Sequence, residues 1–224
     1  MKLSMFLKSF LLLSIFLIPS VYSKEFSFAG IKKILKKEKI LPKHSKQVQN
    51  LLFKLDNKAV PTIVEIMKSD KYPDQSRWLA TLSLARIMGL KSLPFIKKFL
   101  RHPNWMMRLS ALKVIRMFKD KSSEKTIEKM LFDKSLLVRV EALEMIKSFK
   151  TKNSAKTVWK MMYDKKNYQK FNKSKVIPTE VISRILKTIQ TLDYKEAKPA
   201  LIKLRNEKKF SLLNKDIQNT INSL

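Results

Sequence analysis

The chain has 224 residues and carries 48 lysines and arginines against 18 aspartates and glutamates, which gives a net charge of +30 at neutral pH. It contains no cysteine, two histidines and two glycines. Disulfides, thiol nucleophiles, thiolate metal sites, multi-histidine metal sites and glycine-rich phosphate loops are therefore excluded. We accordingly expect no catalytic residues, no metal and no cofactor.

The first 23 residues have the three-part layout of a secretory signal peptide. Two lysines precede an uncharged apolar run from Phe10 to Ile18, Pro19 ends that run, and Val21 and Ser23 stand three residues and one residue before a cleavage point. The run has about half of the ~20 residues that span a bilayer. We therefore predict cleavage after Ser23, a periplasmic or secreted location, and no integral membrane span in the mature chain. Retention of the segment as an anchor is the alternative.

Helical patterns begin soon after this segment. An N-terminal helix is expected around Phe28 to Lys37, as a cap over residues 24–44. A hairpin of two helices is expected from about Ser45 to Lys68, because Pro61 precedes Pro94 by 33 residues in a matching context. Pro94 and Pro199 are predicted to open later helices at the first helical position, where a missing N–H costs nothing.

The middle of the chain repeats every 31 residues, most visibly at Arg77, Arg108 and Arg139, each of which is followed three residues later by an alanine. Within each unit, apolar residues recur at intervals of three and four, which is typical of helices and not of strands. Each unit is therefore predicted to be two helices joined by a short turn. The small alanines are expected to let neighbouring helices approach closely.

After the third unit the register lengthens to 43 residues, so about twelve extra residues lie near Tyr163 to Lys175. This insertion is basic and contains Tyr163, Tyr168 and Phe171, a possible binding segment. Interleaved basic and aromatic residues suit single-stranded nucleic acid or an acidic partner. A tolerated loop without function is the alternative. Beyond it, the tail from Leu212 to Ile221 is predicted to form one closing helix.

The segment from Asp133 to Leu143 follows the pattern D-x-x-x-x-V-R-x-x-A-L and resembles HEAT repeats, in particular the short bacterial class similar to phycobilisome-lyase repeats. Weaker copies begin at Arg77 and Arg108, and His102 stands where the pattern has an aspartate. The resemblance covers residues 45–206. It implies an all-α fold, a right-handed α-solenoid of about five HEAT-like helical hairpins without a sheet, in which each unit buries its apolar face against the next.

These observations divide the chain into a signal peptide at 1–23, a helical cap at 24–44 and a HEAT-like repeat domain at 45–224 with the insertion near 163–175. The repeated arginines are interpreted as structural, holding carbonyls or acidic groups of adjoining repeats. The other interpretation, a row of anion-binding groups, stays open.

A second column of residues is the candidate binding site. It consists of four lysines on the predicted second helices, 31 residues apart and 43 at the last step: Lys98, Lys129, Lys160 and Lys203. The resemblance implies that second helices line a concave face. Chance is the competing explanation, because the chain has 40 lysines against 8 arginines, a bias that an AT-rich genome also produces.

The function favoured by these features is that of an exported, monomeric, non-catalytic interaction module that binds an acidic protein or an anionic envelope polymer, as an inhibitor or scaffold in the cell envelope. The alternative is a HEAT-like DNA glycosylase or another nucleic-acid-binding protein, with Asp164 near Trp159 or Asp74 near Trp78 as the required carboxylate. The export segment argues against nucleic acid. Lysine also supplies diffuse attraction to anions, whereas arginine is the usual reader of guanine.

Overall fold

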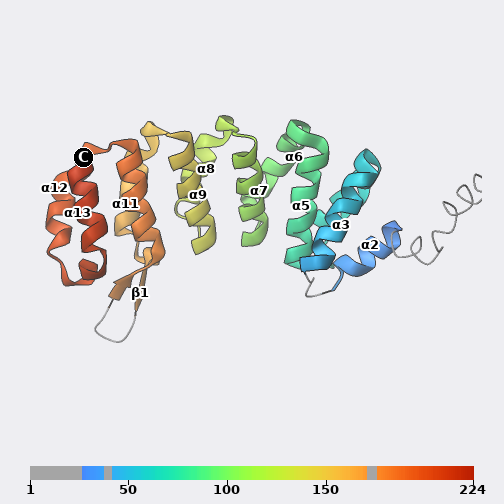
Figure 1. Ribbon diagram of the computed structural model, residues 1–224, viewed down its shortest axis with the longest axis horizontal. Helices are drawn as coiled ribbons and strands as arrows, with labels where there is room; N and C mark the ends of the chain where they lie inside the picture. The colour runs from blue at the N-terminus through green and yellow to red at the C-terminus, as the bar shows by residue number, and fades with distance from the viewer. Residues whose placement is uncertain (1–26, 38–41, 171–175) are drawn as a thin grey trace, which may run out of the picture. The chain divides into compact units, whose positions relative to one another are not determined.

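The computed structural model describes residues 27–37, 42–170 and 176–224 and divides after Ile87 into two compact units (Figure 1). Each unit is described by itself. The predicted signal peptide and Phe171 lie outside the described residues.

The regular secondary structure of the first unit is helical in its described residues. Its elements are α2 (Phe28–Leu35), α3 (Pro42–Leu55), the 3-10 helix η1 (Asp56–Ala59), α4 (Val60–Lys68) and α5 (Asp74–Met88), whose last residue already belongs to the second unit. The expected N-terminal helix is thus present as α2, and the Ser27 side chain caps it by accepting a hydrogen bond from the Gly30 N–H at 3.1 Å. Ile31 and Leu35 on α2 are fully buried.

The second unit repeats a pair of helices. In chain order it contains η2 (Gly89–Ser92), α6 (Leu93–Ile96), η3 (Lys97–Arg101), α7 (Trp105–Met117), η4 (Lys121–Ser123), α8 (Glu124–Met130), α9 (Leu136–Phe149), η5 (Lys152–Ser154), α10 (Ala155–Lys160), η6 (Met161–Tyr163), η7 (Lys165–Asn167), β1 (Tyr168–Lys170), β2 (Val176–Pro178), α11 (Glu180–Leu192), η8 (Lys195–Ala197), α12 (Lys198–Arg205), η9 (Lys208–Leu213) and α13 (Asn214–Ser223). The closing helix predicted from the tail is α13.

The helices of the second unit form two layers. The first helices, α7, α9, α11 and α13, pack one against the next. The second helices, α8, α10 and α12, each pack against the first helix that follows them in the chain. Leu112, Leu143 and Leu186 are fully buried at matching positions of three successive first helices. The predicted helical repeat architecture is therefore confirmed, because one apolar face per unit is covered by the next unit.

The turns after the first helices share one backbone conformation. Five residues there have a positive φ between 46° and 55°: Asp56, Gly89, Lys119, Lys150 and Asp193. Glycine adopts this left-handed conformation freely, whereas other L-residues pay about 1–2 kcal/mol for it. In a chain with only two glycines, four of the five turns therefore store a small strain.

The prediction that the fold contains no sheet is wrong. Strand β1 lies in the predicted insertion and pairs antiparallel with β2, which directly follows the insertion, with Tyr168 opposite Pro178 and Lys170 opposite Val176. Tyrosine, valine and isoleucine favour extended backbone, and Pro178 terminates a strand that has no further partner. Each strand has three residues, which is too short to show an alternating pattern in the sequence.

The proline positions need a smaller correction. Pro94 and Pro199 are the second residues of α6 and α12, one position later than expected. Both helices continue directly from a 3-10 turn, so the residue before each proline is already helical. The second position also lacks an intrahelical acceptor for its N–H, and proline is therefore tolerated there.

Among the described residues, one helical stretch, Asp74–Arg101, is apolar and long enough to cross a membrane by length and composition. Half of its most apolar window is buried within the fold. It also comprises four successive helical segments, α5, η2, α6 and η3. Core helices pass the same test, so this stretch gives no reason to assign a membrane span.

Candidate interaction surface

The repeated arginines hold the stack together, as predicted. The guanidinium of Arg108 on α7 forms two hydrogen bonds of 2.7 Å to the carboxylate of Asp133 in the next repeat. Its remaining nitrogen donates to the carbonyl oxygens of His102 and Pro103, each at 2.7 Å. The Arg108 and Asp133 side chains are only 12% and 7% exposed. This arginine is therefore a buried clamp and is not free to bind an external anion.

Arg139 makes the equivalent contacts in the next repeat with a different acceptor. It donates to the backbone carbonyls of Asp133 and Lys134, at 2.9 and 3.1 Å, and to the side-chain oxygen of Asn167 at 2.8 Å. Burial lowers the pKa of Arg139 against the opposing effect of the charges of Asp164 and Asp133. Asn167 is fully buried and also donates to the Met161 carbonyl at 2.8 Å. The sequence pattern did not indicate Asn167.

In the first unit, Arg77 on α5 belongs to the same series. Its Nε donates to the Met67 carbonyl at 3.1 Å, and a guanidinium nitrogen lies 3.8 Å from the Asp74 carboxylate. Arg77 is 6% exposed. All three members of the arginine register are thus engaged inside the fold.

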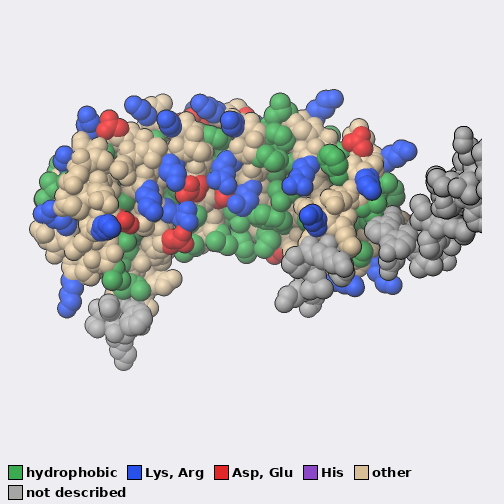
Figure 2. Space-filling model, viewed as in Figure 1, with side chains coloured by type: hydrophobic (Ala, Val, Ile, Leu, Met, Phe, Trp, Pro, Cys, Tyr) green, Lys and Arg blue, Asp and Glu red, His purple; other side chains and the backbone are tan. Residues whose placement is uncertain are grey.

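The layer of first helices carries most of the paired charges of the second unit. Glu141 on α9 lies 3.0 Å from Lys113 and 2.9 Å from Arg116, both on α7. Glu144 on α9 lies 2.8 Å from both Lys147 and Arg184, so the ion pairs continue to α11. Figure 2 shows basic and acidic side chains side by side on the face where α7, α9 and α11 lie in front.

The four predicted binding lysines occupy equivalent, exposed places in the second unit. Lys98 lies on η3, directly after α6, and Lys129, Lys160 and Lys203 lie on α8, α10 and α12. All four are exposed, and within the described part of the chain none of their ammonium groups has an ion-pair partner. We call these four residues the lysine ladder. That the second helices line a concave surface stays a prediction.

A groove beside the first rung of the ladder has a basic rim. It lies between two successive second-helix segments and has a volume of about 460 Å³. Lys98 and Arg101 come from η3, and Ser122 and Thr126 come from η4 and α8 on the opposite side. A nearby cation, Lys97, is already paired with Asp120 at 2.7 Å. The groove therefore offers Lys98 and Arg101 for contact with an anion, beside the hydroxyl groups of Ser122, Ser123 and Thr126.

Two further lysines belong to the same face and were missed from the sequence. Lys125 and Lys156 are exposed and lie one helical turn before Lys129 and Lys160. Residues four apart on a helix are neighbours, so each pair brings two positive charges close together. On α8 this pair lies beside Glu124 and Glu128, whereas α10 has no carboxylate. The 31-residue register of these two positions is broken by Pro94 on one side and Pro199 on the other. Because prolines occupy the neighbouring positions of this register, Lys125 and Lys156 were not recognised as a column of lysines in the sequence.

The insertion brings together two of its three predicted aromatic residues. Tyr163 is 61% exposed and packs edge-on against Trp159, with ring centroids 5.9 Å apart. Tyr168 is half-buried, and its hydroxyl donates to the Met162 carbonyl. Both residues line one pocket of about 540 Å³. The third aromatic, Phe171, lies outside the described residues.

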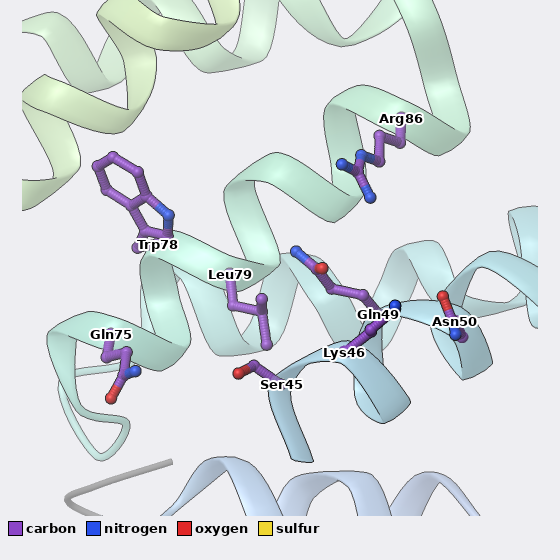
Figure 3. A pocket seen from close by; sticks show the side chains of 8 residues that line it. All are labelled: Ser45, Lys46, Gln49, Asn50, Gln75, Trp78, Leu79 and Arg86. Atoms are coloured by element: carbon purple, nitrogen blue, oxygen red, sulfur yellow. The ribbon is translucent and has the colours of Figure 1, made fainter. Parts of the chain in front are cut away.

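A separate hollow of about 550 Å³ lies between α3 and α5 in the first unit. Figure 3 shows the Gln49 side chain of α3 and the Arg86 side chain of α5 extending into the space between these helices. Its other lining side chains are mainly neutral and polar, with Trp78 and Leu79 as the apolar exceptions. No residue predicted from the sequence to bind a partner contributes to it.

The carboxylates proposed for the DNA glycosylase alternative have structural roles. Asp164 accepts a hydrogen bond from the Lys166 backbone N–H at 3.0 Å, and its side chain is 15% exposed. Asp133 accepts from the Ser135 N–H at 2.8 Å in the same way, one repeat earlier. The Asp74 carboxylate lies beside Arg77. Within the described residues, no group of three or more histidine, aspartate or glutamate side chains is arranged to hold a metal ion.

Comparison with known families agrees with the geometry of the stack. Residues 93–169 match the family model of HEAT repeats. This segment consists of HEAT repeats. The matched segment contains α7 to α10 with the Arg108 clamp, whereas membership of the phycobilisome-lyase-like subclass stays a prediction, as does the right-handedness of the solenoid. A comparison with curated proteins gives no match. HEAT repeats indicate a protein-interaction module, and the family is typically non-catalytic.

Proposed function

We propose that this HEAT-repeat protein is an exported interaction module whose lysine ladder binds an acidic protein or another anionic polymer. The observation that carries the proposal is the unequal use of charge in the second unit. The carboxylates of Asp133, Glu141, Glu144 and Glu180 are each paired with an arginine or lysine of the first helices. Among the second helices, α10 and α12 carry no carboxylate, whereas α8 carries Glu124 and Glu128. The four ladder lysines have no such partners within the described residues.

The spacing of the ladder suits an extended anionic partner. Packed helices lie about 8–10 Å apart, so four repeats place positive charges along roughly 30 Å of surface. The Debye length is about 8 Å at physiological ionic strength. Each ammonium group therefore acts mainly on partner charges opposite its own repeat, and one compact anion would engage only a part of the ladder.

The test uses poly-L-glutamate as the probe and compares two variants of equal net charge. In the ladder variant, Lys98, Lys129, Lys160 and Lys203 are all changed to Glu. In the control variant, four exposed lysines of the second unit outside the second helices are changed to Glu: Lys119, Lys134, Lys187 and Lys215. Exposed charges contribute little to stability, so both variants are expected to remain folded.

We expect the ladder variant to lose most of its affinity for poly-L-glutamate and the control variant to lose less. Binding of the unchanged protein should weaken steeply when salt rises from about 0.1 M to about 1 M, as the Debye length falls from about 10 Å to about 3 Å. Equal losses in the two variants would mean that only bulk charge matters and that the ladder is an accident of composition.

Export is a separate part of this proposal and rests on the sequence alone. The expected mature protein begins at Lys24 and is recovered from an extracytoplasmic fraction. Mass spectrometry of the protein from its own cells decides the point, because an intact N-terminus at Met1 in the cytoplasm would contradict it.

A further inference from the structure

The insertion carries a pocket that combines apolar walls with positive charge. Met162, Tyr163, Tyr168 and Val176 supply the apolar surface, and Lys165, Lys170 and Lys209 supply the charge. Among the residues that the structure describes, no carboxylate lines this pocket. Its volume of about 540 Å³ lies within the usual range of about 300–1,000 Å³ for ligand pockets. We call it the insertion pocket.

One wall of the pocket is held firmly by the fold. The Tyr168 hydroxyl donates to the Met162 carbonyl, and the Tyr168 ring packs edge-on against Phe210 at a centroid distance of 6.2 Å. Thr179 fixes the base of the hairpin, because its N–H and its hydroxyl each donate to the Asn167 carbonyl at 2.9 Å. Asn167 is in turn held by Arg139. The pocket is thus anchored to the repeat stack.

The opposite side of the pocket offers apolar surface to solvent. Tyr163 is 61% exposed and Val176 is 41% exposed. Exposed apolar side chains that converge on a hollow mark an interaction site more often than scattered ones do. A partner that contributes an aromatic or branched aliphatic side chain would bury this surface.

The charges around the pocket specify what should flank that side chain. Within the described residues, Lys165 and Lys170 have no ion-pair partner. Lys209 lies 2.9 Å from Glu207, and its ammonium group stands over the Phe210 ring, 4.9 Å from the centroid. Two uncommitted cations therefore border an apolar hollow, which complements carboxylates on either side of an apolar residue.

We propose that the insertion pocket binds an acidic peptide of the partner by accepting one apolar side chain between flanking carboxylates. The inference rests on the proposed function, since Lys160 of the ladder lies one helical turn before Tyr163 and the basic face therefore reaches the pocket. The ladder supplies attraction over a long surface. The pocket selects the segment that docks.

The geometry favours a peptide over single-stranded nucleic acid. Successive bases need a track of exposed aromatic faces. Here Tyr168 is turned edge-on into Phe210 and is half-buried, which leaves Tyr163 as the one largely exposed ring of the pocket among the described residues. A hollow with one exposed ring can take up an apolar side chain, whereas a run of stacked bases requires several exposed rings in a row.

The test compares two fluorescein-labelled heptapeptides by fluorescence anisotropy. One peptide has a phenylalanine between two runs of three glutamates, and the other has glycine in its place. We expect the full-length protein to bind the phenylalanine peptide about ten-fold more tightly, since burial of such a side chain typically contributes at least that factor. The variant Tyr163→Ser should reduce this preference to about two-fold. The matched control Leu137→Ser removes a 49% exposed apolar residue of α9 that lies outside the pocket, and it should leave the preference unchanged.

The outcomes separate this inference from the proposed function. Equal binding of the two peptides, both weakened in the ladder variant, would overturn the pocket and leave the proposed function standing. If Tyr163→Ser removes the preference for the phenylalanine peptide and the ladder variant binds both peptides unchanged, the result supports the pocket and overturns the lysine ladder as a binding site. The pocket would be overturned as a peptide site if the protein bound neither peptide. It would also be overturned if an oligothymidylate of equal charge displaced the phenylalanine peptide at a lower concentration than an unlabelled acidic peptide does.

Discussion

The Arg108 clamp allows a quantitative test of what holds the stack together. Replacing Arg108 by leucine leaves the Asp133 carboxylate, whose side chain is 7% exposed, without its cation. Breaking a buried ion pair by removing one partner costs about 3–5 kcal/mol. Asp133 keeps its hydrogen bond from the Ser135 N–H at 2.8 Å, so we expect the lower end, about 3 kcal/mol. For a domain of this size, that loss corresponds to a fall in melting temperature of about 6–12 °C.

Arg139→Leu is the internal comparison. Its partners are the amide oxygen of Asn167 and backbone carbonyls, including that of Lys166 at 2.9 Å, all of which are neutral. Replacing this arginine leaves neutral oxygen acceptors without a donor but leaves no carboxylate without a cation. It also removes a positive charge whose burial is unfavourable. We therefore expect a smaller loss, of about 1–2 kcal/mol.

Urea denaturation followed by circular dichroism measures both losses. A double-mutant cycle with Asp133→Asn, which keeps the capping oxygen, should show a coupling of about 1–3 kcal/mol between Arg108 and Asp133. Coupling near zero would refute the reasoning, because the pair would then behave like a solvent-screened surface salt bridge. An Arg139→Leu variant less stable than Arg108→Leu would refute it as well.

Three further outcomes follow from the described contacts. Leu143→Ala should cost about 2–4 kcal/mol in urea denaturation, because Leu143 is fully buried and its truncation leaves a cavity. Lys150→Gly should stabilise by about 0.5–1 kcal/mol in the same assay, since φ is 51° at that turn. Burial raises the pKa of Glu144, but the hydrogen bonds and charges of Lys147 and Arg184 together lower it by more, so the pKa in the folded protein lies below the usual 4.5. The stabilisation that the ionised Glu144 provides is therefore complete above about pH 4.5 and is lost as the pH falls through the lower folded pKa. Between about pH 6 and pH 3, the melting temperature of the Glu144→Gln variant should fall less than that of the unchanged protein.

The architecture was predictable because its physical cause is periodic. Each unit must bury the same face against the next, so leucines, alanines and arginines recur at fixed intervals, and Leu112 and Leu143 occupy their expected core places. The structural interpretation of Arg108 was predictable for the same reason. Its acceptor lies 25 residues further along the chain, within the following repeat.

Features at positions that depart from the 31-residue repeat were not predicted from the sequence. Asp164 stands 25 residues after Arg139, where the period places the carboxylate, but Arg139 Nε donates to Asn167, 28 residues away in the insertion. The hairpin at Tyr168 escaped because strands of three residues carry no readable alternation. Lys125 and Lys156 escaped because prolines interrupt their column at both ends. Irregular positions are where a repeat protein differs from its neighbours, so the insertion pocket lies where periodicity gives no guidance.

The distribution of charge separates a basic composition from a basic site. In a chain enriched in lysine by composition alone, the carboxylates would have no preferred cation partners. In the second unit, Glu141 and Glu144 instead lie between first helices, where each contacts two cations, and Asp133 is enclosed by Arg108. These three carboxylates are thus committed to cations of the first helices. Glu124 and Glu128 lie beside Lys125 and Lys129 on α8, whereas α10 and α12 carry lysines and no carboxylate. The positive potential of the second helices therefore favours an anionic partner most strongly along α10 and α12.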